Sequence, residues 1–221
     1  MRKKLFLTVA ATAAALVALA ATPAQAAGAV LTYGSLGGTA VPAGHVIQSN
    51  LKSGTNATFY SSPTGTTGVT CTGSSFSGTV LTNPGAGGIA TESVTAHSFS
   101  GCTTNVPGAT CVQSIVVNNL PYSAAVNGTT KVITITGSAA APIQTTIKLC
   151  TLLGTVTCVY RADLNTVTGA TDNGDNSITF TNQKFNRFSG PGTCFANGYF
   201  TAKYAPVRDT SVSGSPLVFV Q

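Results

Sequence analysis

The chain has 221 residues, of which eleven are Lys or Arg and five are Asp or Glu, so charged residues make up only 7% of it. An average soluble domain has roughly 25% charged residues, and long solvated helices need them on their outer faces. The composition therefore argues against a helical protein, and a hydrophobic content of 43% argues against intrinsic disorder. Threonine and serine together account for a quarter of the chain, which favours strands with hydroxyl groups on their solvent face.

The N-terminus has the three parts of a secretory signal peptide. Residues 2–4 are basic, residues 5–20 form an uncharged apolar stretch, and residues 24–26 form a small-x-small cleavage site. A membrane anchor is the alternative, but the apolar stretch is short for a span of about 20 residues. We predict a cleaved signal peptide at 1–26 and a secreted, extracellular protein of residues 27–221. Cleavage removes three of the eleven cations and leaves a net charge of +3.

The remaining cations do not indicate a charged partner. They are scattered, whereas nucleic-acid binding needs a clustered basic patch. No second apolar segment approaches bilayer length, so we expect no transmembrane segment in the mature chain. The sequence says nothing about the oligomeric state. The eight cations are Lys52, Lys131, Lys148, Arg161, Lys184, Arg187, Lys203 and Arg208.

Short runs of alternating β-branched residues, separated by Gly, Pro and Asn turns, predict a series of strands. Their spacing near ten residues is typical of a β-sandwich or barrel-like fold. No long linker divides the chain, so we predict a single all-β domain. The runs are 46–51, 57–60, 76–81, 89–99, 114–120, 131–136, 143–149, 155–161, 177–181, 199–204 and 217–220.

All six cysteines lie after the signal peptide, and an even number in an exported chain indicates disulfides. Six cysteines allow fifteen pairings, which sequence alone cannot decide. We predict three bridges that each join neighbours along the chain and stabilise the domain. They are Cys71–Cys102, Cys111–Cys150 and Cys158–Cys194.

A short repeat supports the first of these bridges. Residues 75–78 and 98–101 are both Ser-Phe-Ser-Gly, and 188–190 repeat the central Phe-Ser-Gly. One explanation is a duplicated binding hairpin. We favour a simpler one, in which each copy is a buried Phe before a glycine turn or bulge, on two adjacent strands tied by Cys71–Cys102.

Few residues are available for catalysis. There is no G-x-S-x-G motif, so the serine elbow of α/β-hydrolases is absent. A Ser-His-acid triad would have to use His45 or His97. In a regular strand Glu92 would face away from His97. The candidates are therefore His97 as the base, Ser98 as a nucleophile if the strand bulges there, and Asp163 as an acid.

The remaining acids indicate structural roles. The segment 172–176 is typical of a turn in which Asx side chains bond their own backbone. Arg161 with Asp163, and Arg208 with Asp209, predict salt bridges. No cysteine pair lies within ligand spacing of a histidine, and we expect neither a metal site nor a cofactor.

Several stretches resemble a known group of proteins. They are 29–34, 143–149, 157–162, 176–180 and 199–207. Together with the signal peptide they resemble small secreted actinomycete proteins, some of which are assigned as cholesterol esterases of an unusual short type. The resemblance covers nearly the whole mature chain and implies a secreted ester hydrolase acting on sterol or lipid esters, with an apolar ester as substrate. It includes no catalytic motif, and a non-catalytic secreted β protein of the cell surface or matrix is the alternative.

Overall fold

The computed structural model describes residues 28–221, so the predicted signal peptide at 1–26 lies outside the described residues. The prediction of an all-β fold is confirmed. Each of the eleven predicted runs overlaps a strand, and the described part contains no helix beyond the short 3-10 turn Asp163–Asn165. The strands are β1 Leu31–Tyr33, β2 Thr39–Ala40, β3 Val46–Asn50, β4 Ala57–Tyr60, β5 Gly68–Thr82, β6 Ile89–Thr104, β7 Ala109–Asn118, β8 Tyr122–Asn127, β9 Val132–Thr136, β10 Gln144–Thr151, β11 Gly154–Ala162, β12 Thr166–Asp172, β13 Ser177–Ser189, β14 Asn197–Tyr204, β15 Arg208–Asp209 and β16 Val218–Val220.

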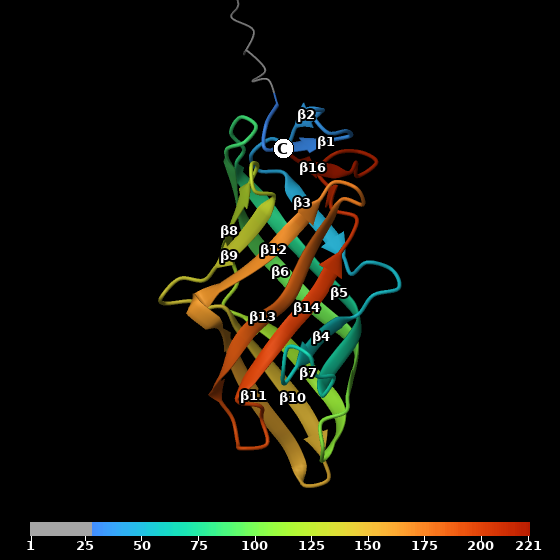
Figure 1. Ribbon diagram of the computed structural model, residues 1–221, viewed down its shortest axis with the longest axis vertical. Coiled ribbons are helices and arrows are strands. Elements are labelled where there is room, and N and C mark those ends of the chain that lie inside the picture. Colours follow the sequence, from blue (N-terminus) through green and yellow to red (C-terminus); the bar gives the residue numbers. More distant parts are fainter. Residues whose placement is uncertain (1–27) are drawn as a thin grey trace, which may run out of the picture.

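Eight antiparallel strands close into a barrel, in the order β12-β9-β8-β6-β5-β4-β14-β13 (Figure 1). Pairing of β12 with β13 completes the ring. Closure removes the exposed edges at this level of the barrel, where all eight strands are paired on both sides. Of the two predicted architectures, the barrel is therefore the correct one.

The wall extends beyond this ring along its long strands. The second half of β13 pairs with β11, which is followed by β10 and β7. Beyond Val94, β6 pairs only with β5, and β7 pairs only with β10. Among residues 28–221 no ladder joins β6 to β7, and we call this unpaired boundary the seam.

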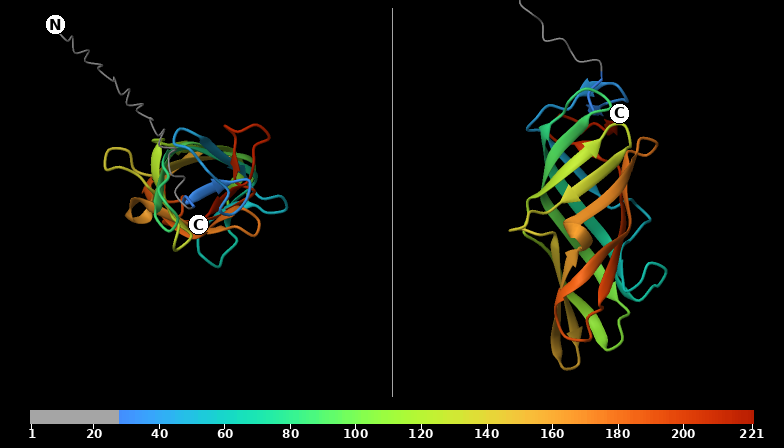
Figure 2. Two further views of the ribbon diagram at one scale, coloured as in Figure 1. Left: turned by 90° about the horizontal axis from the view of Figure 1, so that it is seen from above. Right: turned by 60° about the vertical axis from the view of Figure 1, so that its left-hand side comes forward.

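A separate three-stranded sheet of β2, β1 and β16 caps one end of the barrel. Seen from above, the barrel strands form a ring and β1 lies across its opening (Figure 2). The cap contributes Val30, Leu31, Val41, Val218 and Val220 to the buried core. Apolar burial of this kind is the main force that holds the cap in place.

The three predicted disulfides are all present. Cys71–Cys102 joins β5 to β6, Cys111–Cys150 joins β7 to β10, and Cys158–Cys194 joins β11 to the loop before β14. Each closes a loop of 31 to 39 residues. Such a bridge restricts the conformations of the unfolded chain and thereby stabilises the folded state by roughly 3–4 kcal/mol. Three disulfides are consistent with an extracellular environment.

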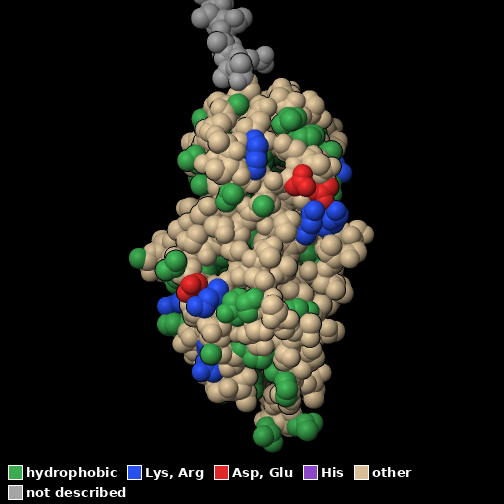
Figure 3. Space-filling model, viewed as in Figure 1, with side chains coloured by type: hydrophobic (Ala, Val, Ile, Leu, Met, Phe, Trp, Pro, Cys, Tyr) green, Lys and Arg blue, Asp and Glu red, His purple; other side chains and the backbone are tan. Residues whose placement is uncertain are grey.

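The outer surface follows the composition. Alternate residues of each strand point inward, as in β14, where Gly198, Phe200, Ala202 and Tyr204 are buried and their neighbours are not. Figure 3 shows few charged side chains on the face it presents.

The predicted Asx turn is confirmed, since the Asp172 carboxylate accepts a hydrogen bond from the backbone of Gly174. No helix in the described part of the chain is long and apolar enough to span a membrane.

Both predicted salt bridges are wrong. Arg161 donates to Gln144 and stacks on the Phe188 ring, while Asp163 accepts from Asn186 and faces Lys184. β11 ends at Ala162 and Asp163 begins the 3-10 turn, so the strand alternation that would place Asp163 beside Arg161 does not reach it. Asp209 is directed inward and bonds His45, whereas Arg208 donates to the backbone of Ser215.

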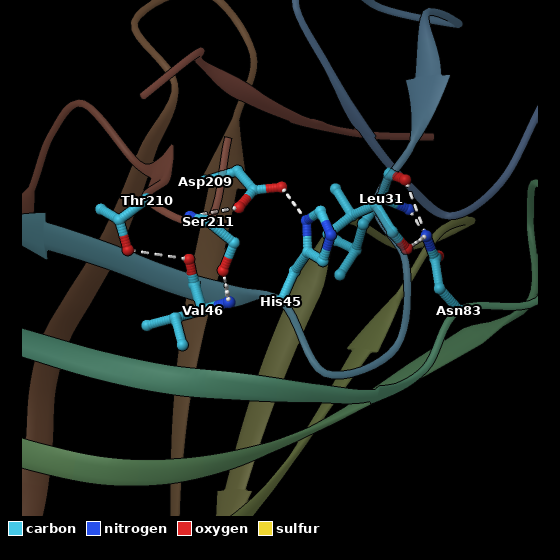
Figure 4. A network of polar contacts seen from close by, with 8 residues as sticks. Leu31, His45, Val46, Asn83, Asp209, Thr210 and Ser211 are labelled. Carbon is cyan, nitrogen blue, oxygen red and sulfur yellow. Dashed lines mark hydrogen bonds and ion pairs between the residues drawn. The ribbon is translucent and has the colours of Figure 1, made fainter. Parts of the chain in front are cut away.

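Asn83 ties the cap to the barrel. Its side chain accepts from the Leu31 amide and donates to the carbonyls of Leu31 and Val41, each at 2.8 Å (Figure 4). We expect Asn83→Ala to lower the free energy of unfolding by about 2 kcal/mol, because the Leu31 amide and the Val41 carbonyl lose their partner and the Leu31 carbonyl keeps only the Val41 amide. A urea titration measures this; Asn83→Asp should cost at least as much, because its second carboxylate oxygen would face the two carbonyls to which the amide donates. An unchanged midpoint in Asn83→Ala would show that the amide does not hold the cap.

Candidate functional site

A bulge in β6 decides which side chains enter the barrel. Val94 and Ala96 lie opposite consecutive residues of β5, Gly78 and Ser77, so Thr95 is an extra residue in the ladder. A bulge of this kind shifts the inward–outward alternation by one residue. Glu92 therefore points inward before it and His97 points inward after it. The expectation that the two face opposite ways, which assumed a regular strand, is wrong.

The barrel interior contains a cavity of about 90 Å³. Its wall is mostly aliphatic and aromatic and includes residues from both sides of the seam, namely Phe99 of β6 and Ile115 and Val117 of β7. The ionisable side chains in this wall are the carboxyl of Glu92, the imidazole of His97 and the phenol groups of Tyr122 and Tyr204. An apolar cavity with a few polar groups is the usual form of a site for a small apolar molecule.

His97 and two hydroxyl groups form a polar cluster at the cavity wall. Tyr204, which is completely buried, has its hydroxyl 2.7 Å from His97 Nε2 and 2.8 Å from Ser74 Oγ. Ser74 Oγ lies 3.4 Å from the same nitrogen and donates to the carbonyl of Ser98. Burial lowers the pKa of His97 to about 4 and raises the pKa of Tyr204. The imidazole is therefore neutral at pH 7, and one hydrogen bond joins its Nε2 to the Tyr204 hydroxyl, with a direction set by the tautomer of the ring.

The other two candidates from the sequence are not at this cluster. Ser98 is exposed and bonds Ser75 on the outer surface, because it alternates with the inward-facing His97. Asp163 lies in the 3-10 turn and bonds Asn186. Within residues 28–221 neither side chain bonds His97. The structure instead brings Tyr204 and Ser74 to the histidine.

The second histidine belongs to a different site. His45 Nδ1 donates to the completely buried Asp209 at 2.7 Å, and Asp209 also accepts from the Ser211 amide (Figure 4). This is the acid–histidine half of a hydrolase triad. The Ser211 hydroxyl accepts from the backbone of Val46, and no hydroxyl of the described chain bonds His45. The two histidines thus divide the triad elements between them: one has an acid and the other has hydroxyls.

Glu92 lies in the same cavity wall as His97. Its side chain is 94% buried, which raises the pKa of its carboxyl to about 7. Burial is the whole cause, and no charge of the described chain offsets it. The sequence offered no signal for Glu92 or Tyr204, because their inward directions depend on the bulge and on barrel closure.

A scan against protein-family models and searches of curated proteins and of solved structures found no match. Within residues 28–221 no three His, Cys, Asp or Glu side chains are grouped as a metal site would require.

Proposed function

We propose that this chain is a secreted hydrolase of sterol or lipid esters that takes the acyl chain into the barrel cavity. The observation that carries the proposal is His97, a neutral imidazole in the wall of an otherwise apolar cavity. Ester hydrolysis needs a base and a stabiliser of the oxyanion. The resemblance to secreted proteins assigned as cholesterol esterases supports the same activity.

His97 is the base in this reaction. Its Nε2 takes a proton from a water molecule, whose oxygen attacks the ester carbonyl carbon. The tetrahedral intermediate expels the alcohol oxygen, which takes the proton back from the imidazolium, so the products are a fatty acid and an alcohol. Tyr204, 2.7 Å from Nε2, turns its hydroxyl hydrogen to the developing oxyanion. Water is the nucleophile because Ser74 lies beside Nε2 but not in the cavity wall.

The substrate reaches the cavity through the seam. Phe99 on β6 and Ile115 and Val117 on β7 line both the cavity and the unpaired boundary. Separation of two strands that share no ladder breaks no backbone hydrogen bonds between them. The disulfides support this route, since Cys71–Cys102 fixes the β6 side, Cys111–Cys150 fixes the β7 side, and no described bridge crosses.

A second candidate is a carrier that binds apolar molecules without catalysis. It is favoured by the mutual bonding of His97, Tyr204 and Ser74, which leaves no hydroxyl free to attack. In this case the cluster only satisfies buried polar groups.

Fatty-acid release separates the two candidates. We expect residues 27–221 to release oleate from cholesteryl oleate, and p-nitrophenol from a short ester, above a boiled control. His97→Ala should lose at least roughly 100-fold in rate, the typical contribution of a general base. His45→Ala is the matched control and should keep full activity, because His45 lies outside the cavity wall.

Two outcomes would contradict this proposal in different ways. If the wild-type chain releases neither oleate nor p-nitrophenol, the hydrolase proposal fails and the carrier is the remaining candidate. Retained activity in His97→Ala, with its melting temperature unchanged, removes His97 as the base. Treatment with a phosphonate ester tests the nucleophile: a mass increase on the peptide containing Ser74 would replace water by a serine nucleophile.

A further inference from the structure

Glu92 is a buried acid that nothing in the protein explains. It is 6% exposed and lines two cavities, the main one and a smaller one beneath the cap. Within residues 28–221 its carboxyl has no hydrogen-bond or ion-pair partner, and its pKa is raised by burial alone. An uncompensated buried carboxyl costs several kcal/mol of stability, so an apolar residue would stabilise the barrel better.

The surroundings of Glu92 leave room for a ligand. Ala124 lies directly opposite on β8, and Ala90 precedes it on the inward face of β6. On β5, a Cβ at Gly78 would lie 3.8 Å from the carboxylate oxygen Oε2. The neighbours Ala90, Ala124 and Gly78 are small, Val80 lies directly opposite Glu92 on β5, and none of these four side chains is a hydrogen-bond donor.

Glu92 is too far from His97 to act on the same bond. Their partners on β5, Val80 and Phe76, are four residues apart, which corresponds to about 13 Å at 3.3 Å per residue. A molecule that reaches both groups is therefore long and narrow. The apolar wall between them fits an extended hydrocarbon chain.

We propose that Glu92 anchors the far end of the ligand by accepting a hydrogen bond from a hydroxyl or ammonium group on an apolar chain. The carboxyl accepts no hydrogen bond from the described chain, and it lies in the wall of a mostly apolar cavity. The ligand supplies a donor to it. This inference goes beyond the proposed hydrolase, because it requires binding and no catalysis.

Binding of simple amphiphiles tests the anchor. The probes are dodecyl alcohol, dodecylamine and dodecyl methyl ether, which has no donor, each measured by calorimetry with residues 27–221 at neutral pH. We expect the alcohol and the amine to bind at least roughly tenfold more tightly than the ether, a difference typical of one buried hydrogen bond. Glu92→Leu should bind all three alike, since the chain site remains and the acceptor is lost.

Two further variants make the result specific. Glu92→Gln keeps an acceptor without the charge. If the amine forms an ion pair with Glu92, this variant should weaken binding of the amine more than binding of the alcohol. If no ion pair forms, it should weaken binding of both equally. Asp163→Asn removes an exposed carboxylate and should change nothing. If Glu92→Leu still binds the alcohol and the amine more tightly than the ether, the proposal is overturned. Failure of the wild-type chain to bind any probe also overturns it. Either result is independent of ester hydrolysis, which His97→Ala tests separately.

Discussion

Gly198→Ala should lower the free energy of unfolding by about 3 kcal/mol, near the upper end of what overpacking a core costs. Gly198 is an inward-facing residue of β14, and the Phe59 ring from β4 lies directly against its Cα. A Cβ at this position would lie inside that ring. Phe59 cannot retreat, because it packs edge-on against Tyr160 at 4.9 Å and Phe185 at 5.7 Å.

A double-mutant cycle tests that cause. Phe59→Leu makes room for the new methyl group, so Gly198→Ala should cost at least about 1 kcal/mol less in the Phe59→Leu background than alone. Gly192→Ala is the matched control, since nothing lies within 4 Å of its Cβ position, and it should stay within about 0.5 kcal/mol of wild type. Chemical denaturation measures all four variants. Additive effects of Phe59→Leu and Gly198→Ala would show that the ring is not what excludes the side chain.

The class of fold and its cross-links follow from local features of the sequence. Alternating β-branched residues mark most strands, and the repeats around Phe76 and Phe99 place their strands side by side, which explains the success of the Cys71–Cys102 prediction. The strands that the pattern missed have small inward residues. Examples are Ala124 in β8 and Gly169 in β12, the latter packed against the Phe180 ring. A small residue in the middle of the inward face interrupts the series of large apolar side chains and weakens the period of two.

The site depends on non-local features that the sequence does not display. His45 and Asp209 are 164 residues apart and meet only because β3 pairs with β15. Glu92 shares a cavity with His97 only because one extra residue in β6 shifts the alternation. Gly78 lies at this bulge on β5, but nothing in the sequence of β6 itself marks the extra residue, so a regular strand places Glu92 and His97 on opposite faces.

Replacing the buried Glu92 or the half-buried His97 of β6 should reveal a pH dependence of stability that the wild-type chain conceals. The pKa of Glu92 is raised from 4.5 to about 7, so the folded state binds its proton more tightly and the stability falls as the pH rises from about 4.5 to 7. The pKa of His97 is lowered from 6.5 to about 4, so the stability falls as the pH drops from about 6.5 to 4. Each effect amounts to about 3 kcal/mol.

The two dependences are opposite in sign and overlap between about pH 4.5 and 6.5, so they cancel in the wild-type chain. Glu92→Gln leaves only His97, and its unfolding free energy should rise by about 3 kcal/mol from pH 4 to 6.5. His97→Gln leaves only Glu92, and its unfolding free energy should fall by a similar amount from pH 4.5 to 7. Urea titrations across this range measure both slopes. The other titratable groups of the cavity wall, Tyr122 and Tyr204, have raised pKa values and stay neutral throughout. Parallel pH profiles in the wild type and both variants would mean that neither group is desolvated, and the cavity would then be open to water.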